Sequence, residues 1–162
     1  MSAEKSTTDG VAKLEAVYGP PSQAAFGSAV FTAKLDENRD LEQVAREMYR
    51  RFVGDVWERY GEEAWMGPWK QVYARPTGAT PDIVGELRGI ADQQAATSAP
   101  MILDTIDSPE AARAALIAVY DDSAVKDLRV FSIGDGEAMS GLLVAAARAE
   151  NDEATFLVFL MD

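Results

Sequence analysis

The chain has 162 residues, of which 48% are hydrophobic and 26% are charged. These proportions are ordinary for a globular protein, and the length suits one domain rather than two. The chain has no cysteine and no histidine, which excludes disulfides, thiolate chemistry, histidine-based catalytic triads and the commonest metal ligand.

The net charge of the chain is −12, from 15 basic and 27 acidic residues. Because nucleic-acid affinity comes mainly from lysine and arginine that neutralise phosphates, we expect no nucleic-acid partner. The charge suits a protein partner with a basic surface. No apolar run approaches the roughly 18 residues that cross a bilayer, and the start of the chain is polar, so we expect no membrane partner. With no cysteine to oxidise, the expected location is the cytoplasm.

The N-terminal quarter predicts one short helix and one strand. Residues 1–10 are small, polar and aperiodic, so we expect a disordered segment there and a single globular domain over 11–162. Apolar residues at helical spacing predict a helix over 11–18, which ends at a glycine followed by two prolines. The β-branched and aromatic residues within 28–35 favour a strand.

The clearest periodicity in the chain begins at Asp40, whose side chain suits a helix N-cap. Apolar residues then recur every three or four positions, as in an amphipathic helix. The apolar stripe drifts around the helix axis, so its two ends are expected to touch different parts of the protein. The stripe comprises Leu41, Val44, Ala45, Met48, Tyr49, Phe52, Val53, Val56, Trp57 and Tyr60.

The middle of the chain predicts alternating strands and helices. A short strand is expected over 71–74. Thr80-Pro81-Asp82 has the form of a helix start, and the helix is expected to run to about Thr97. The apolar run that follows Pro100, over 101–106, predicts a strand, and Ser108-Pro109-Glu110 predicts a further helix that reaches Tyr120.

The prediction for the C-terminal third depends on whether residues 138–149 form a helix or a strand. Residues 128–133 and 154–161 are expected to be strands, whereas 138–149 is rich in helix-forming residues and could be a helix. We favour a strand there, because Asp135-Gly136 is a typical hairpin turn and because a helix would be apolar almost all round and interrupted by Gly141. This choice predicts a meander of three antiparallel strands.

The last two strands of this meander are apolar on both faces, so both faces must be covered. Either the main helices divide between the two faces, or a second copy of the chain closes one face as a homodimer. The fold class that we expect is α+β: a mixed sheet with a C-terminal antiparallel meander, about residues 128–161, packed against three main helices.

Two motifs with a chemical meaning are better explained by local structure. Asp36, Asn38, Asp40 and Glu47 match ligand positions of an EF-hand loop, but the required glycine is replaced by Leu41, so we favour a capped helix start. The segment Gly134-Asp135-Gly136 resembles part of a phosphate-binding loop, yet its acidic residues would repel phosphate, so we favour a hairpin turn.

The remaining candidates are two groups of residues. An acidic cluster could form and bind a divalent cation if Asp104, Asp107, Asp135 and Glu137 met at one end of the sheet, although solvated turn residues are the ordinary case. All three tryptophans lie between positions 57 and 69. They either fill the core or expose an aromatic surface, and the core is favoured. The candidate binding residues are Trp65, Met66, Trp69, Tyr73 and Arg75.

The function expected from these observations is that of a non-catalytic protein-interaction or regulatory domain, with no cofactor and no metal. The alternative is a small carboxylate-dependent enzyme or a small-molecule-binding domain with its site formed in an oligomer, which would use Tyr73, Arg75 or the acidic residues. Such an enzyme would need a carboxyl group with its pKa moved toward neutrality. A structural subunit of a larger assembly is a third class that fits the two-faced apolar strands.

Overall fold

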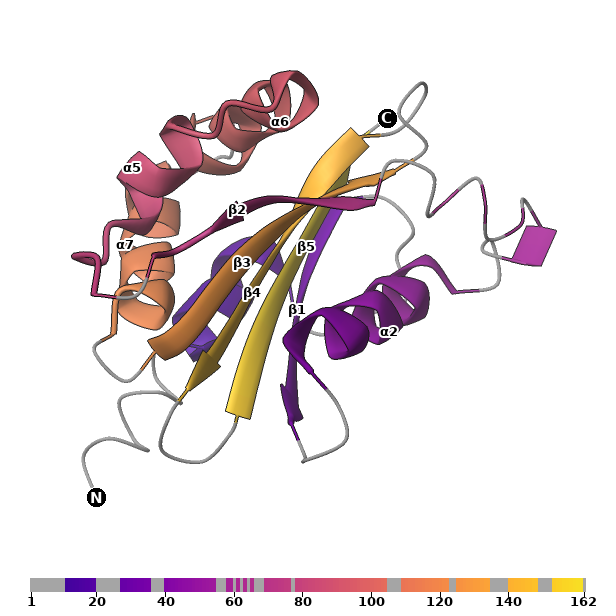
Figure 1. Cartoon of the computed structure of the whole chain (residues 1–162), viewed down its shortest axis with the longest axis horizontal. Helices are drawn as coiled ribbons and strands as arrows, with labels where there is room; N and C mark the ends of the chain where they lie inside the picture. Colours follow the sequence, from indigo (N-terminus) through magenta and orange to yellow (C-terminus); the bar gives the residue numbers. More distant parts are fainter. Residues whose placement is uncertain are drawn as a thin grey trace.

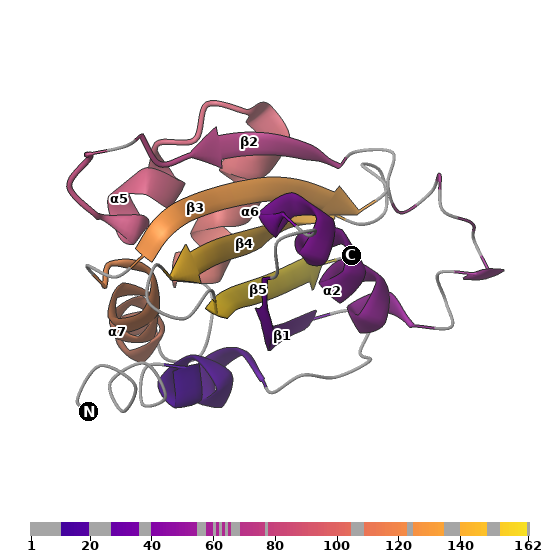
Figure 2. The same ribbon diagram turned by 60° about the horizontal axis from the view of Figure 1, so that its bottom comes forward.

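The computed structural model describes residues 11–19, 27–35, 40–54, 58–59, 61, 63, 65, 69–76, 78–104, 109–122, 125–134, 140–148 and 153–161. These residues form a five-stranded sheet with helices on both faces (Figures 1 and 2). The strands are β1 (Gly27–Lys34), β2 (Lys70–Ala74), β3 (Val125–Gly134), β4 (Ser140–Arg148) and β5 (Glu153–Met161). The helices are a first helix over 11–18, α2 (Leu41–Val53), α5 (Ile83–Arg88), α6 (Gln93–Asp104) and α7 (Pro109–Tyr120).

The strands lie in the order β1-β5-β4-β3-β2, and each neighbouring pair is antiparallel. The fold is therefore α+β as predicted, and β3, β4 and β5 form the predicted C-terminal meander. The sheet is antiparallel throughout its described strands rather than mixed. β4 over 140–148 confirms the choice of a strand over a helix in this segment. Turn chemistry therefore predicted the structure better than helix propensity did.

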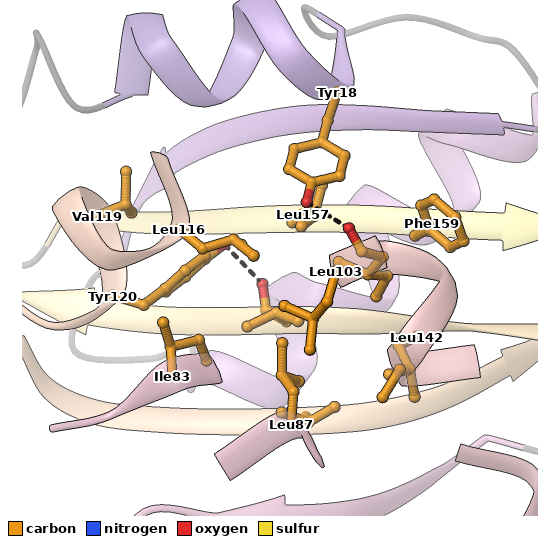
Figure 3. Packing of buried hydrophobic residues seen from close by; sticks show 14 of the residues in the cluster. Tyr18, Ile83, Leu87, Leu103, Leu116, Val119, Tyr120, Leu142, Leu157 and Phe159 are labelled. Atoms are coloured by element: carbon orange, nitrogen blue, oxygen red, sulfur yellow. Dashed lines mark hydrogen bonds between the residues drawn. The ribbon is translucent and has the colours of Figure 1, made fainter. Parts of the chain in front are cut away.

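One face of the sheet, which we call the α7 face, is covered by α5, α6, α7 and the first helix (Figures 1 and 2). Its side chains from the strands are Val30, Leu128, Val130, Leu142, Val144, Ala146, Leu157 and Phe159. Figure 3 shows several of these side chains packed against Leu87, Leu103 and Leu116 of the helices. Two buried tyrosines cross this layer: the Tyr18 hydroxyl donates to the Ile102 carbonyl at 2.8 Å and that of Tyr120 to the Val144 carbonyl at 3.2 Å.

The opposite face, which we call the α2 face, is covered by α2 (Figure 1). Its side chains from the strands are Ala29, Phe31, Phe131, Ile133, Leu143, Ala145, Ala147, Ala154, Phe156, Val158 and Leu160. The helix begins as predicted, because the Asp40 side chain accepts a hydrogen bond from the Gln43 amide at 2.7 Å. It ends at Val53, where Gly54 adopts a φ of 69° that favours glycine. The predicted last turns, with Val56, Trp57 and Tyr60, lie outside the described residues.

The segment between β2 and α7 differs from the prediction. The helix expected from Asp82 to Thr97 is two helices, α5 and α6. Of the strand expected over 101–106, residues 101–104 form the last turn of α6, and residues 105 and 106 lie outside the described residues. Pro100 lies inside α6, although a proline in a helix interior removes one hydrogen bond. The missed signal is a helical spacing of buried residues that spans this proline: Ala95, Ala99, Ile102 and Leu103. Burial of this stripe on the α7 face outweighs the disruption that the proline causes.

Both apolar faces of the sheet are thus covered by helices of the same chain. Of the two arrangements that the sequence left open, the structure has the one in which the helices divide between the faces. A homodimer is therefore not needed to cover a face. Within the described part of the chain, no helix has the length and apolar character to span a membrane.

Candidate functional site

Trp65 is part of the core of the α2 face, where its side chain is 0% exposed. Its carbonyl accepts a hydrogen bond from the Tyr49 hydroxyl at 3.3 Å, and the two rings meet edge to face. This is the core placement that the sequence favoured. Met66 lies outside the described residues.

Trp69 is half-buried at the start of β2, on the same side of the sheet. Its ring stacks on Phe131, with 4.8 Å between the ring centroids, and its Nε1 donates to Glu42 at 3.0 Å. The guanidinium of Arg46 lies 5.6 Å from the ring centroid. Trp69 is therefore held by α2 and β3, and its contacts join these elements to β2.

Tyr73 and Arg75 lie on the α7 face, so the five candidate binding residues do not form one surface. Arg75 lies just after β2, and its side chain is only 8% exposed. Its guanidinium makes a two-point contact with Glu86 of α5, at 2.8 and 2.6 Å. It also donates to the Tyr120 carbonyl at 2.9 Å and to Asp121 at 3.2 Å. We call Tyr73, Arg75, Glu86 and Asp121 the Arg75 cluster.

The Arg75 cluster fastens three elements together. The Tyr73 hydroxyl donates to Glu86 at 2.5 Å, and the Asp121 carboxylate accepts from the Ile83 amide at 2.8 Å. The edge strand β2 is thus tied to the start of α5 and to the end of α7. A cation next to the last carbonyls of α7 also interacts favourably with the helix dipole.

The Arg75 cluster changes the proton affinity of its members. Partial burial alone would raise the pKa of Glu86, but hydrogen bonds from Arg75 and Tyr73 and the charge of Arg75 outweigh it, so the pKa lies below its usual value of 4.5. Burial raises the pKa of Asp121, and it raises the pKa of Tyr73 to about 12, with a contribution from the hydrogen bond to Glu86. Glu86 therefore stays ionised near neutral pH and is a poor proton donor.

A cleft of about 390 Å³ lies beside the Arg75 cluster, between the loop that follows β2 and the start of β3. The cleft exists because β2 stops pairing at Ala74, opposite Arg129, while β3 begins four residues earlier at Val125. One further backbone hydrogen bond joins the two segments, from the Arg75 amide to the Leu128 carbonyl at 2.9 Å. The cleft is lined by Arg75, Pro76, Gly78, Ala79, Pro81, Val125, Lys126, Asp127 and Leu128.

Of the four residues of the candidate acidic cluster, only Asp104 lies within the described residues, so whether the cluster forms stays a prediction. Asp104 lies at the end of α6, where it contacts Arg88 at 3.0 Å and Arg113 at 3.1 Å. The hydrogen bond from Arg88 lowers the pKa of Asp104. Asp107, Asp135 and Glu137 lie outside the described residues. In the part of the chain that the structure describes, no three acidic residues are grouped so as to hold a metal ion.

Glu86 and Asp121 are members of the site that the sequence analysis missed. Glu86 follows the N-cap Asp82 by four residues, in a segment for which the sequence predicts only a helix. Asp121 follows α7 and is 46 positions from Arg75. A near-buried arginine requires acidic partners, but the sequence does not indicate which carboxylates reach it.

Replacing Arg75 by Met is expected to lower the free energy of unfolding by about 3 kcal/mol, because Glu86 and Asp121 would lose the cation that compensates their burial. Arg88→Met is the matched control, since the Arg88 pair with Asp104 is exposed to solvent, and it is expected to cost much less. Urea unfolding of both variants measures the difference. Equal losses would show that the Arg75 cluster does not hold the helices to β2.

The two acids of the Arg75 cluster are expected to have opposite effects on the pH dependence of stability. Glu86, with a lowered pKa, stabilises the fold above about pH 4.5, and this contribution disappears as pH falls through the folded-state pKa. Asp121, with a raised pKa, contributes stability below about pH 3.8 that disappears as pH rises through its folded-state pKa. As pH rises, the wild type should therefore gain stability relative to Glu86→Gln below about pH 4.5 and lose stability relative to Asp121→Asn above about pH 3.8. Slopes of the same sign in urea unfolding would contradict this assignment.

Comparison of the chain with protein-family models, curated proteins and solved structures finds no significant match. The function is therefore inferred from the geometry and charge of this chain alone.

Proposed function

We propose that this chain is a non-catalytic protein-interaction or regulatory domain of the cytoplasm that binds a protein with a basic surface through the cleft beside the Arg75 cluster. The proposal includes no nucleic-acid partner, no cofactor and no metal. A homodimer is a further proposal, which now has to rest on an interface other than an uncovered sheet face.

The observation that carries this proposal is that the charged groups around the cleft are already used in contacts within the chain. Arg75 is bound by Glu86, Asp121 and the Tyr120 carbonyl, and Asp127 accepts two hydrogen bonds from Arg129 at 3.2 and 3.1 Å. General acid or base catalysis needs a group whose pKa is close to the working pH and which can reach the substrate. Glu86 does not meet the first requirement, and Asp121 is committed to Arg75 and to the Ile83 amide.

The charge of the chain supports a basic partner. With a net charge of −12, long-range attraction speeds the encounter with a positively charged surface and slows it for an acidic one. Most of this attraction is screened at high ionic strength. The proposed complex should therefore form more slowly as salt is added.

The volume of the cleft favours a second candidate, a small-molecule-binding domain. Small-molecule sites usually have volumes of roughly 300–1,000 Å³, and this cleft of about 390 Å³ lies within that range. The loop wall of proline, glycine and alanine offers apolar contact, and Lys126 and Asp127 supply polar groups. In this second candidate function, Arg75 lines the binding site as a rigid side chain and takes no part in a reaction.

Ala79→Arg tests both candidates, because it places a bulky cation in the cleft from an exposed position. Ala96→Arg on the exposed side of α6 adds the same side chain outside the cleft lining and serves as the control. We expect Ala79→Arg to weaken binding of a copurifying basic protein at least about tenfold, which corresponds to 1.4 kcal/mol, while Ala96→Arg leaves it unchanged. Quantitative affinity purification followed by titration of the identified partner gives this comparison.

Two results would overturn the leading proposal. One is a partner whose affinity is the same for the wild type and for both variants. The other is a small molecule retained by the wild type and by Ala96→Arg and lost from Ala79→Arg, which would establish the second candidate instead.

A further inference from the structure

Arg148 is a second buried arginine, at the end of β4 and on the α7 face of the sheet. Its side chain is only 6% exposed. The ion pair that the structure gives it, from Nη1 to Asp122, is long at 3.4 Å. No atom of the described residues accepts a hydrogen bond from its buried Nε. Because a buried donor without an acceptor is costly, this N–H group requires a further partner.

A small cavity lies next to this side chain. It is bordered by α7, β3, β4 and β5, and its lining residues are Ala118, Val119, Val125, Ala146, Arg148 and Thr155. The polar side chains in this lining are the guanidinium of Arg148 and the hydroxyl of Thr155. Thr155 lies on the strand next to Arg148 and is itself buried.

The size of the cavity decides which ligand it can take. The centre of a water molecule can occupy a volume of about 10 Å³ in this cavity. A cavity holds one water molecule when this volume is roughly 10–15 Å³ or more. The space is therefore sufficient for one water and too small for phosphate, a carboxylate or any larger ligand. The guanidinium in the lining would attract an anion, but its charge is already paired with Asp122. The nearby C-terminal end of α7, which carries partial negative charge, further disfavours a monatomic anion.

We propose that this cavity is a binding site for one internal water molecule. The water accepts the hydrogen bond of Arg148 Nε and donates one to the Thr155 hydroxyl. It thereby joins β4 to β5 at the end of the sheet that is covered by α7. It also accounts for how a guanidinium whose ion pair within the described residues is long is kept inside the protein.

A high-resolution crystal structure of the whole chain, from crystals soaked in bromide, tests the position and the nature of this ligand. The expected result is one density peak about 2.7–3.2 Å from Arg148 Nε, with no anomalous signal from bromide. An anomalous peak at that point would identify an anion site and overturn the proposal. Absence of any peak, with Nε still unpaired, would overturn it as well.

NMR in solution supplies a second readout that does not depend on crystals. The Nε–H group of Arg148 should show a dipolar cross-peak to a long-lived water and should exchange with solvent at least about tenfold more slowly than that of the exposed Arg46. Thr155→Val removes the hydroxyl without a large change of volume and should weaken this cross-peak. An Arg148 signal that exchanges as fast as that of Arg46, or a cross-peak unaffected in a folded Thr155→Val protein, would contradict the proposed site.

Discussion

The fold depends on one constraint, which is that the central strands of the sheet are apolar on both faces. Every residue of β4 from Gly141 to Arg148 is buried, and in β5 the same is true from Ala154 to Leu160. A sheet with such strands is stable only when both faces are covered. The chain meets this requirement by placing α2 on one face and the first helix, α5, α6 and α7 on the other. The alanines of β4 keep its side chains small on both faces.

The need to cover both faces also explains why polar contacts gather at the ends and edges of the sheet. The Arg75 cluster holds α5 and α7 to the edge strand β2, where apolar packing is thinner than at the centre. Trp69 has a comparable role on the α2 face, through Glu42 and Phe131. The cleft follows from the same geometry, because the chain leaves β3 after Arg75 in order to start α5. The cleft beside the Arg75 cluster therefore results from the way in which α5 and α7 are attached to β2.

The parts of the fold that depend on local signals could be predicted from the sequence. Turn chemistry, together with the apolar character of 138–149 on all sides, predicted the three-stranded meander, and Asp40 predicted the start of α2. The prediction was wrong for 101–104, because Pro100 obscured a helical stripe whose stability comes from burial against the sheet. The Arg75 cluster could be predicted only in part, since Arg75 and Tyr73 were singled out but their partners Glu86 and Asp121 come from other elements. Such contacts depend on tertiary packing, which local sequence patterns do not indicate.

The proposed interaction function is tested most directly by native mass spectrometry of the protein purified gently from its own cells, without a chelator. A single spectrum reports bound proteins, metals and small molecules together. The expected result is the 17.5 kDa chain in complex with a basic protein and free of other bound mass, with the complex lost as ionic strength rises. A chain that instead carries a tightly held metal ion or metabolite, retained at high ionic strength, would contradict it.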